Sequence, residues 1–173
     1  MANIFSSLDK KEVDRIQLHV EDNSKIMDGI VTDIISPYVK DLDSYVQFIR
    51  GCLKDGNNPP SDVELEDFCM NLSTYIYFAG GMCEQLGIRD DIAKAVYKET
   101  FNNARDNHEG TVQDKNSLAE LSAQQEQLVS IAYTRAYKIV KSKVDNAQEL
   151  LSSCKKCLSR RMQEQALTRM INT

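Results

Sequence analysis

Residues 111–173 read TVQDKNSLAELSAQQEQLVSIAYTRAYKIVKSKVDNAQELLSSCKKCLSRRMQEQALTRMINT, 63 consecutive positions without a glycine or a proline. These two residue types interrupt helices, so their absence indicates helix throughout the stretch. Its second half has apolar residues at spacings of three and four, the period of one helix face: Val140, Val144, Ala147, Leu151, Cys154 and Leu158. As one helix the stretch would span about 95 Å. We therefore expect a very long C-terminal helix.

The N-terminal third of the chain shows the same spacing twice. The first seam is a heptad pattern with one polar member: Val13, Ile16, Val20, Asn23, Met27, Ile30 and Ile34. Proline disfavours helical backbone in the residue before it, so we expect this helix to end at Pro37. A second seam follows at Val39, Leu42, Val46, Ile49 and Leu53. Residues 1–56 are thus predicted to form an N-terminal helical hairpin.

The double proline Pro59-Pro60 marks a boundary, and we assign residues 57–61 to a linker. Residues 62–173 are predicted to form a longer helical hairpin with its turn between Asp106 and Asp114. Gly80-Gly81 lies within its first helix; we expect close helix packing there, with a kink or a nearby ligand as alternatives. With only 7 Gly and 3 Pro, the chain lacks the turns of a sandwich or barrel. The predicted fold is an all-α helical bundle of coiled-coil character.

Charge is distributed unevenly along the chain. The chain has 21 Lys+Arg and 26 Asp+Glu, a net charge of −5, yet residues 135–173 hold nine basic and three acidic side chains. Such a segment meets phosphate groups or an acidic protein surface, or it is simply a solvated helix face. An odd number of cysteines and no secretory leader indicate a reducing compartment, so we expect a cytoplasmic protein. No apolar run approaches the roughly 20 residues that cross a bilayer.

Motifs for catalysis or cofactor binding are weak. The two histidines, His19 and His108, have no second pair of metal ligands at a suitable spacing. Cys154 and Cys157 form a C-x-x-C motif, but it lies inside a predicted helix with no strand before it, so we interpret it as packing. Gly80-Gly81 has no following Gly-Lys-Ser/Thr and is not a phosphate loop. We expect no catalytic site, no cofactor, no metal and no small-molecule substrate.

Basic and aromatic residues alternate between Tyr133 and Lys143. Cations track phosphates and flat rings accept unstacked bases, which is the combination that binds single-stranded nucleic acid. The rings could equally pack against a partner helix. The candidate nucleic-acid-binding residues are Tyr133, Arg135, Tyr137, Lys138, Lys141, Lys143, Lys155, Lys156, Arg160 and Arg161.

From about Ser61 to Ile171 the layout resembles the UvsY-type recombination mediators of phages. The resemblance lies in four stretches, residues 96–99, the polar loop 107–112, residues 150–154 and the basic segment 158–162. It implies a cytoplasmic homo-oligomer, in a bacterial host cell, that binds single-stranded DNA. It also implies partners, either a recombinase that the protein helps to load or a single-strand-binding protein, and no nucleotide or metal cofactor.

Two functional hypotheses therefore remain open. The first is a non-enzymatic, oligomeric single-stranded DNA binder of the mediator type. The second is a helical protein–protein module, structural or regulatory, whose basic helix meets an acidic protein surface. In either case we expect the apolar seams of the C-terminal helix, Leu128 to Ile139 and Val140 to Leu158, to need burial against another subunit.

Overall fold

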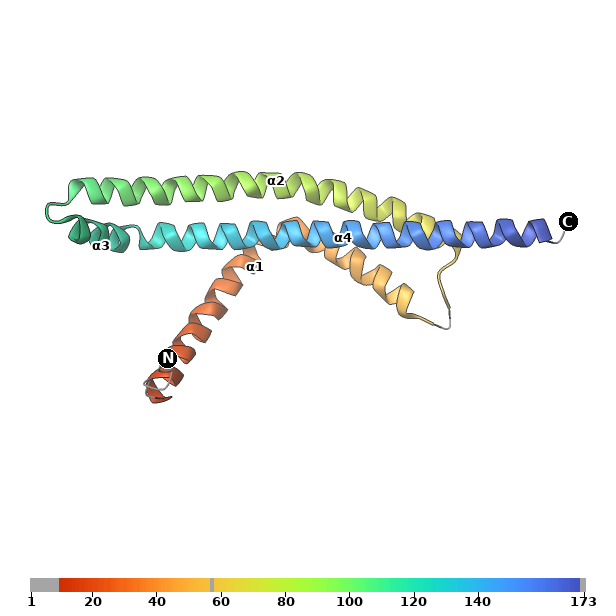
Figure 1. The fold of residues 1–173 in the computed structure, drawn as a ribbon, viewed down its shortest axis with the longest axis horizontal. Coiled ribbons are helices and arrows are strands. Elements are labelled where there is room, and N and C mark those ends of the chain that lie inside the picture. The colour runs from red at the N-terminus through yellow and green to blue at the C-terminus, as the bar shows by residue number, and fades with distance from the viewer. Residues whose placement is uncertain (1–9, 57, 172–173) are drawn as a thin grey trace, which may run out of the picture.

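The chain forms four α-helices in the computed structural model, which describes residues 10–56 and 58–171. They are α1 (Lys10–Lys54), α2 (Asp62–Asn107), α3 (Val112–Ser122) and α4 (Gln124–Ile171), and the described residues contain no strand. Helices α2 and α4 run side by side, and α1 crosses α4 near the middle of its length (Figure 1). The predicted all-α bundle is confirmed.

Helix α2 begins with a capping box. The Glu64 N–H donates to Ser61 Oγ at 3.3 Å, and the Ser61 N–H donates to Glu64 Oε2 at 2.7 Å. This exchange satisfies two backbone donors that the helix would otherwise leave unpaired. From there α2 continues for 46 residues.

Glycines within α2 mark where it meets α4, but at a position other than the predicted one. A Cβ added at Gly80 or Gly81 would meet nothing within 4 Å, so the close packing expected there was wrong. A Cβ at Gly87 would lie 3.3 Å from the ring of Tyr137. A side chain at position 87 would therefore crowd the Tyr137 ring of α4.

The long hairpin turns where the sequence predicts it. Helix α2 ends at Asn107, and Thr111 caps α3 through a second capping box with Asp114. The single helix expected for residues 111–173 is interrupted once, at Ala123, so this prediction was wrong at that residue. The Ala123 N–H still donates to the Ala119 carbonyl at 3.0 Å, and the Gln127 N–H to the Ala123 carbonyl at 2.9 Å. Ala123 is therefore hydrogen-bonded to both α3 and α4.

Helix α1 is continuous through Pro37, which corrects the predicted pair of N-terminal helices. Proline cannot donate to the carbonyl four residues earlier, and its ring crowds that carbonyl, so a helix bends there. Figure 1 shows α1 as two arms that meet at a bend where the helix crosses α4, the first arm before Pro37 and the second arm after it. Val31 and Val39, one on each side of the proline, are both buried in the same cluster. This shared packing accounts for a helix that persists across Pro37.

The core lies between α2, the second arm of α1 and the second half of α4. Its centre includes Leu42, Ile49, Leu65, Phe68, Leu72, Val144, Ala147 and Cys154. A smaller cluster surrounds the bend and includes Val31, Val39, Cys83, Leu86, Ala132, Ala136 and Val140. The seam from Val140 to Leu158 is thus covered within the chain, and the expectation that another subunit must bury it was wrong. In the other seam, Leu128, Ile131 and Ile139 are 36–49% exposed.

Candidate nucleic-acid interface on helix α4

The solvent face of α4 carries a strip of three cations. Ala136 and Val140 lie on the side of α4 that is buried in the core, so residues on the opposite side face solvent. Arg135, Lys138 and Lys141 follow one another at intervals of three, which places them along one strip, and all are exposed. Within the described residues none of the three forms an ion pair. Their charges remain available to a ligand.

A second group of cations lies further along α4. Lys155, Lys156 and Arg160 are exposed, and Arg160 pairs with Glu164 at 2.9 Å. That pair is largely solvated, so it competes weakly with another anion. Asp145 and Glu149 are also exposed, between the two groups. The 14 residues from Lys141 to Lys155 correspond to about 21 Å of helix, so the basic surface consists of two separate groups.

Two of the candidate cations, Lys143 and Arg161, form ion pairs with other parts of the fold. Lys143 Nζ lies 2.5 Å from Asp43 Oδ2 and ties α4 to the second arm of α1. Arg161 Nη1 donates to the Pro60 carbonyl at 2.6 Å and lies 3.3 Å from Asp62 Oδ1. Arg161 thereby secures the segment that leads into α2. Both side chains are about one third exposed.

The two candidate rings lie on the inner side of α4. Tyr133 and Tyr137 are half-buried and pack against the cluster at the bend. The contact between Tyr137 and Gly87 fixes that ring against α2. The rings therefore lie apart from the cationic strip and pack against the cluster, as in the alternative to base stacking that the sequence left open.

A buried carboxylate connects α2 and α4 beside this region. Asp90 is 4% exposed and accepts hydrogen bonds from Thr134 Oγ1 at 2.6 Å and Lys94 Nζ at 2.7 Å. Burial opposes its ionisation and is the largest single influence, but the bonds from Lys94 and Thr134, with the charges of Lys94 and Lys138, outweigh it and lower its pKa. The sequence analysis missed this residue, because Asp90-Asp91 resembles an ordinary acidic pair on a helix.

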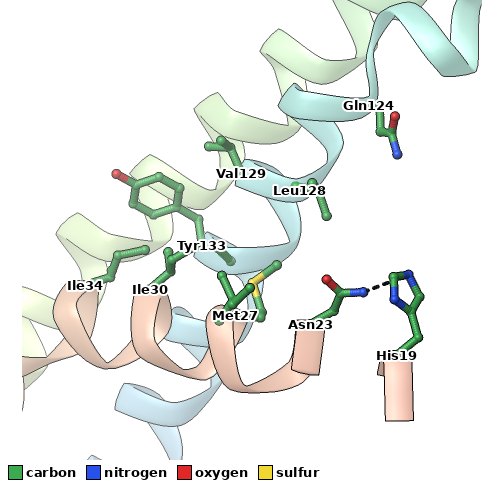
Figure 2. Close-up of a pocket in the computed structure, with 11 residues that line it drawn as sticks. His19, Asn23, Met27, Ile30, Ile34, Gln124, Leu128, Val129 and Tyr133 are labelled. Carbon is green, nitrogen blue, oxygen red and sulfur yellow. Dashed lines mark hydrogen bonds between the residues drawn. The ribbon is translucent and has the colours of Figure 1, made fainter. Parts of the chain in front are cut away.

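An apolar groove separates the first arm of α1 from the start of α4. Its volume is about 760 Å³, and its walls include Met27 and Ile30 on α1 and Leu128 and Val129 on α4 (Figure 2). At its open end Asn23 Nδ2 lies 3.2 Å from His19 Nε2. The sequence predicted the apolar seam of α1, but the spacing gave no sign of a groove against α4.

The cysteines are all free, and three of them are buried. Burial raises the pKa of the Cys69, Cys83 and Cys154 thiols, which keeps them protonated near neutral pH. Cys154 belongs to the core between α1, α2 and α4, while Cys157 packs at its edge. Among the described residues no group of three or more His, Cys, Asp or Glu is placed to hold a metal ion.

Comparisons of the chain with protein-family models, with curated proteins and with solved structures give no match. Within the described parts of the chain, no helix has the length and apolarity needed to cross a membrane.

Proposed function

We propose that this chain is a non-enzymatic protein that binds single-stranded DNA along the solvent face of α4, in the manner of a recombination mediator. The observation that carries the proposal is the exposed strip of Arg135, Lys138 and Lys141, free of ion pairs within the described residues. An acidic chain repels a polyanion at long range, so binding requires a local concentration of cations. The resemblance to phage mediators supports the same reading.

Affinity in this proposal comes from phosphate contacts. The half-buried rings of Tyr133 and Tyr137 lie away from the strip, so base stacking on them contributes little. Binding should therefore be independent of sequence and strongly dependent on salt. Lys155, Lys156 and Arg160 extend the contact toward the end of α4 when a strand is long enough to pass Asp145 and Glu149.

The test is a salt titration of binding to a fluorescently labelled, mixed-sequence single strand. Replacing Arg135, Lys138 and Lys141 together by Ala should weaken binding at low salt by at least about tenfold. It should also reduce the slope of log affinity against log salt by about 2, because each lost contact with a single strand removes about 0.7. Alanine favours helix, so α4 should stay folded, which circular dichroism would verify.

The control removes an equal charge elsewhere. Lys40, Arg50 and Lys98 are exposed cations outside α4, and their joint replacement by Ala matches the first variant residue type for residue type. This control should bind as the parent does. If both triple variants weaken binding equally, net charge alone is responsible and the α4 site is wrong. If the parent does not bind at about 50 mM salt, single-stranded DNA is not the ligand.

The second candidate function is a helical protein–protein module. It is favoured by the inward position of both tyrosines and by the apolar groove beside α4. In that case the strip on α4 would meet an acidic protein surface, such as that of a recombinase or a single-strand-binding protein. A parent protein that does not bind single-stranded DNA but binds another protein through the groove would favour this function.

A further inference from the structure

The first arm of α1 is exposed to solvent over most of its length. Residues 10–26 are all exposed, and the seam residues Ile16 and Val20 are 56% and 60% exposed. Helices in proteins are stabilised mainly by packing of an apolar face, and isolated helices of this length are marginal in water. Of the seam, only Met27 and Ile34 are half-buried. The arm therefore presents an apolar face that needs a partner.

The later part of the seam, from Asn23 to Ile34, faces the groove described above. Figure 2 shows His19, Asn23, Met27, Ile30 and Ile34 along the α1 wall, opposite Gln124, Leu128, Val129 and Tyr133 of α4. A helix has a diameter of about 10–12 Å, so 760 Å³ corresponds to roughly five or six residues of helix. By volume, the groove has room for more than one turn of helix.

We propose that a second copy of this chain docks here, with the seam of its own α1 arm paired to this seam in parallel and in register. A heptad seam is complementary to itself, since each apolar side chain fits between those of an identical helix. By symmetry each arm would enter the groove of the other copy and cover its Leu128 and Val129, which are 49% and 50% exposed. One arrangement thus covers both apolar walls.

Charge and polarity along the arm select the parallel direction. In a fully overlapping antiparallel pair, Glu12 would lie beside Asp33 of the partner subunit, and Asn23 would face an aliphatic Val20. The parallel pair places Glu12 beside a glutamine, Gln17, and brings the two Asn23 side chains together, where they can hydrogen-bond to each other. Asn23 is the single polar residue of the seam, and one polar residue at such a position specifies the register of a coiled coil.

The length of the seam suffices for a stable contact. From Val13 to Ile34 it covers three heptads, about 32 Å of helix. Together with Leu128 and Val129 the contact covers roughly several hundred Å² on each partner, approaching the roughly 800 Å² of a standard interface. The proposal does not depend on DNA binding, and its test contains no nucleic acid, so the two can fail separately.

Two residues of equal exposure give a matched test. Val20 lies in the seam and Leu18 lies outside it, and each is 60% exposed on the same arm. The mass of the protein would be measured by sedimentation equilibrium from about 1 to 100 μM. The parent and Leu18→Asp should self-associate alike, and Val20→Asp should raise the dissociation constant at least about tenfold. A monomeric parent, or equal effects of the two substitutions, would overturn the proposal.

Cross-linking distinguishes the register and direction. In a parallel, in-register pair the two copies of residue 23 approach to disulfide distance. Asn23→Cys should therefore form a covalent dimer on mild oxidation, above the background of the five native cysteines. Lys25→Cys, on the outer side of the arm, should remain at that background. If Asn23→Cys combined with Gln124→Cys gives only an intrachain disulfide in a monomer, the arm closes on its own α4 and the proposal is wrong.

Discussion

The two arms of α1 have the same apolar spacing and opposite environments. In the second arm Val39, Leu42 and Ile49 are at most 3% exposed, whereas in the first arm Val13, Ile16 and Val20 are 39–60% exposed. Both patterns correctly predict helix. The comparison shows that heptad spacing specifies a helix with an apolar face, but it does not specify which surface covers that face.

The difference between the arms follows from what lies beside them. The second arm leads into the linker and α2, and Lys143 on α4 reaches its Asp43. The arm therefore lies between two long helices and shares their core. Before Pro37 the chain leaves that core, and the described residues supply only one wall of a groove, the start of α4.

Truncating one apolar residue in each arm gives the sharpest contrast. Ile49→Ala, at a site that is 0% exposed, should lower the free energy of unfolding by about 2–5 kcal/mol, because it leaves a cavity in the core. Ile16→Ala, at a site 56% exposed, should change it by less than about 0.5 kcal/mol in dilute, monomeric protein. Urea denaturation followed by circular dichroism measures both. Equal losses would mean that the first arm is packed in solution after all.

Removal of Asp90 tests the hydrogen-bonded contact between α2 and α4. Asp90→Ala should destabilise the protein by about 1–3 kcal/mol, because Thr134 and Lys94 lose a buried acceptor. Asp91→Ala, next to it but exposed, is the control and should have little effect. Denaturation midpoints of the two variants measure this difference.

Acid should remove the contribution of Asp90. Its pKa in the folded protein lies below the ordinary value of 3.8, so its ionised form stabilises the fold above that value. This stability is lost as pH falls through the lower, folded pKa. The stability advantage of the parent over Asp90→Asn should therefore be constant from pH 7 to about pH 5 and shrink below pH 4. An advantage that persists unchanged at pH 2.5 would contradict the assignment.

The ion pair that holds the second arm should have the smallest effect. Lys143 and Asp43 are 33% and 38% exposed, so solvent screens their attraction. A double-mutant cycle to Ala should give a coupling of about 0.5 kcal/mol. The exposed pair of Arg160 and Glu164, 81% and 59% exposed, should give less under the same conditions. A coupling above about 2 kcal/mol would show that the arm depends on this pair more than on its apolar seam.

Local signals in the sequence predicted most of the fold. The double proline before α2, the turn before Thr111 and the helical spacings each act within a few residues, so they are visible without the structure. The end of α1 at Pro37 was predicted wrongly, because the valines that hold the helix together there contact residues far away in sequence. Close packing was also predicted at the wrong glycines, Gly80-Gly81, because the contact at Gly87 depends on Tyr137, 50 positions away.

The exposure of the candidate cations was predicted in part. Spacing alone indicated that Arg135, Lys138 and Lys141 share a strip away from the apolar seam, and the structure leaves them exposed. Spacing could not reveal that Lys143 and Arg161 are engaged by Asp43 and Asp62, each about 100 positions away in the chain. Whether a cation is available therefore depends on partners that local sequence does not identify.

The bend at Pro37 makes the first arm of α1 a lever. From Pro37 to Lys10 the helix is about 40 Å long, so a rotation of about 10° at the bend displaces its tip by roughly 7 Å. The same rotation moves Ile34, next to the bend, by less than about 1 Å. The direction of the whole arm therefore depends on how Val31 and Val39 pack on either side of Pro37, which lacks the backbone N–H of a helical hydrogen bond. A substitution at either valine would act at a distance, on the tip of the arm, without touching the seam.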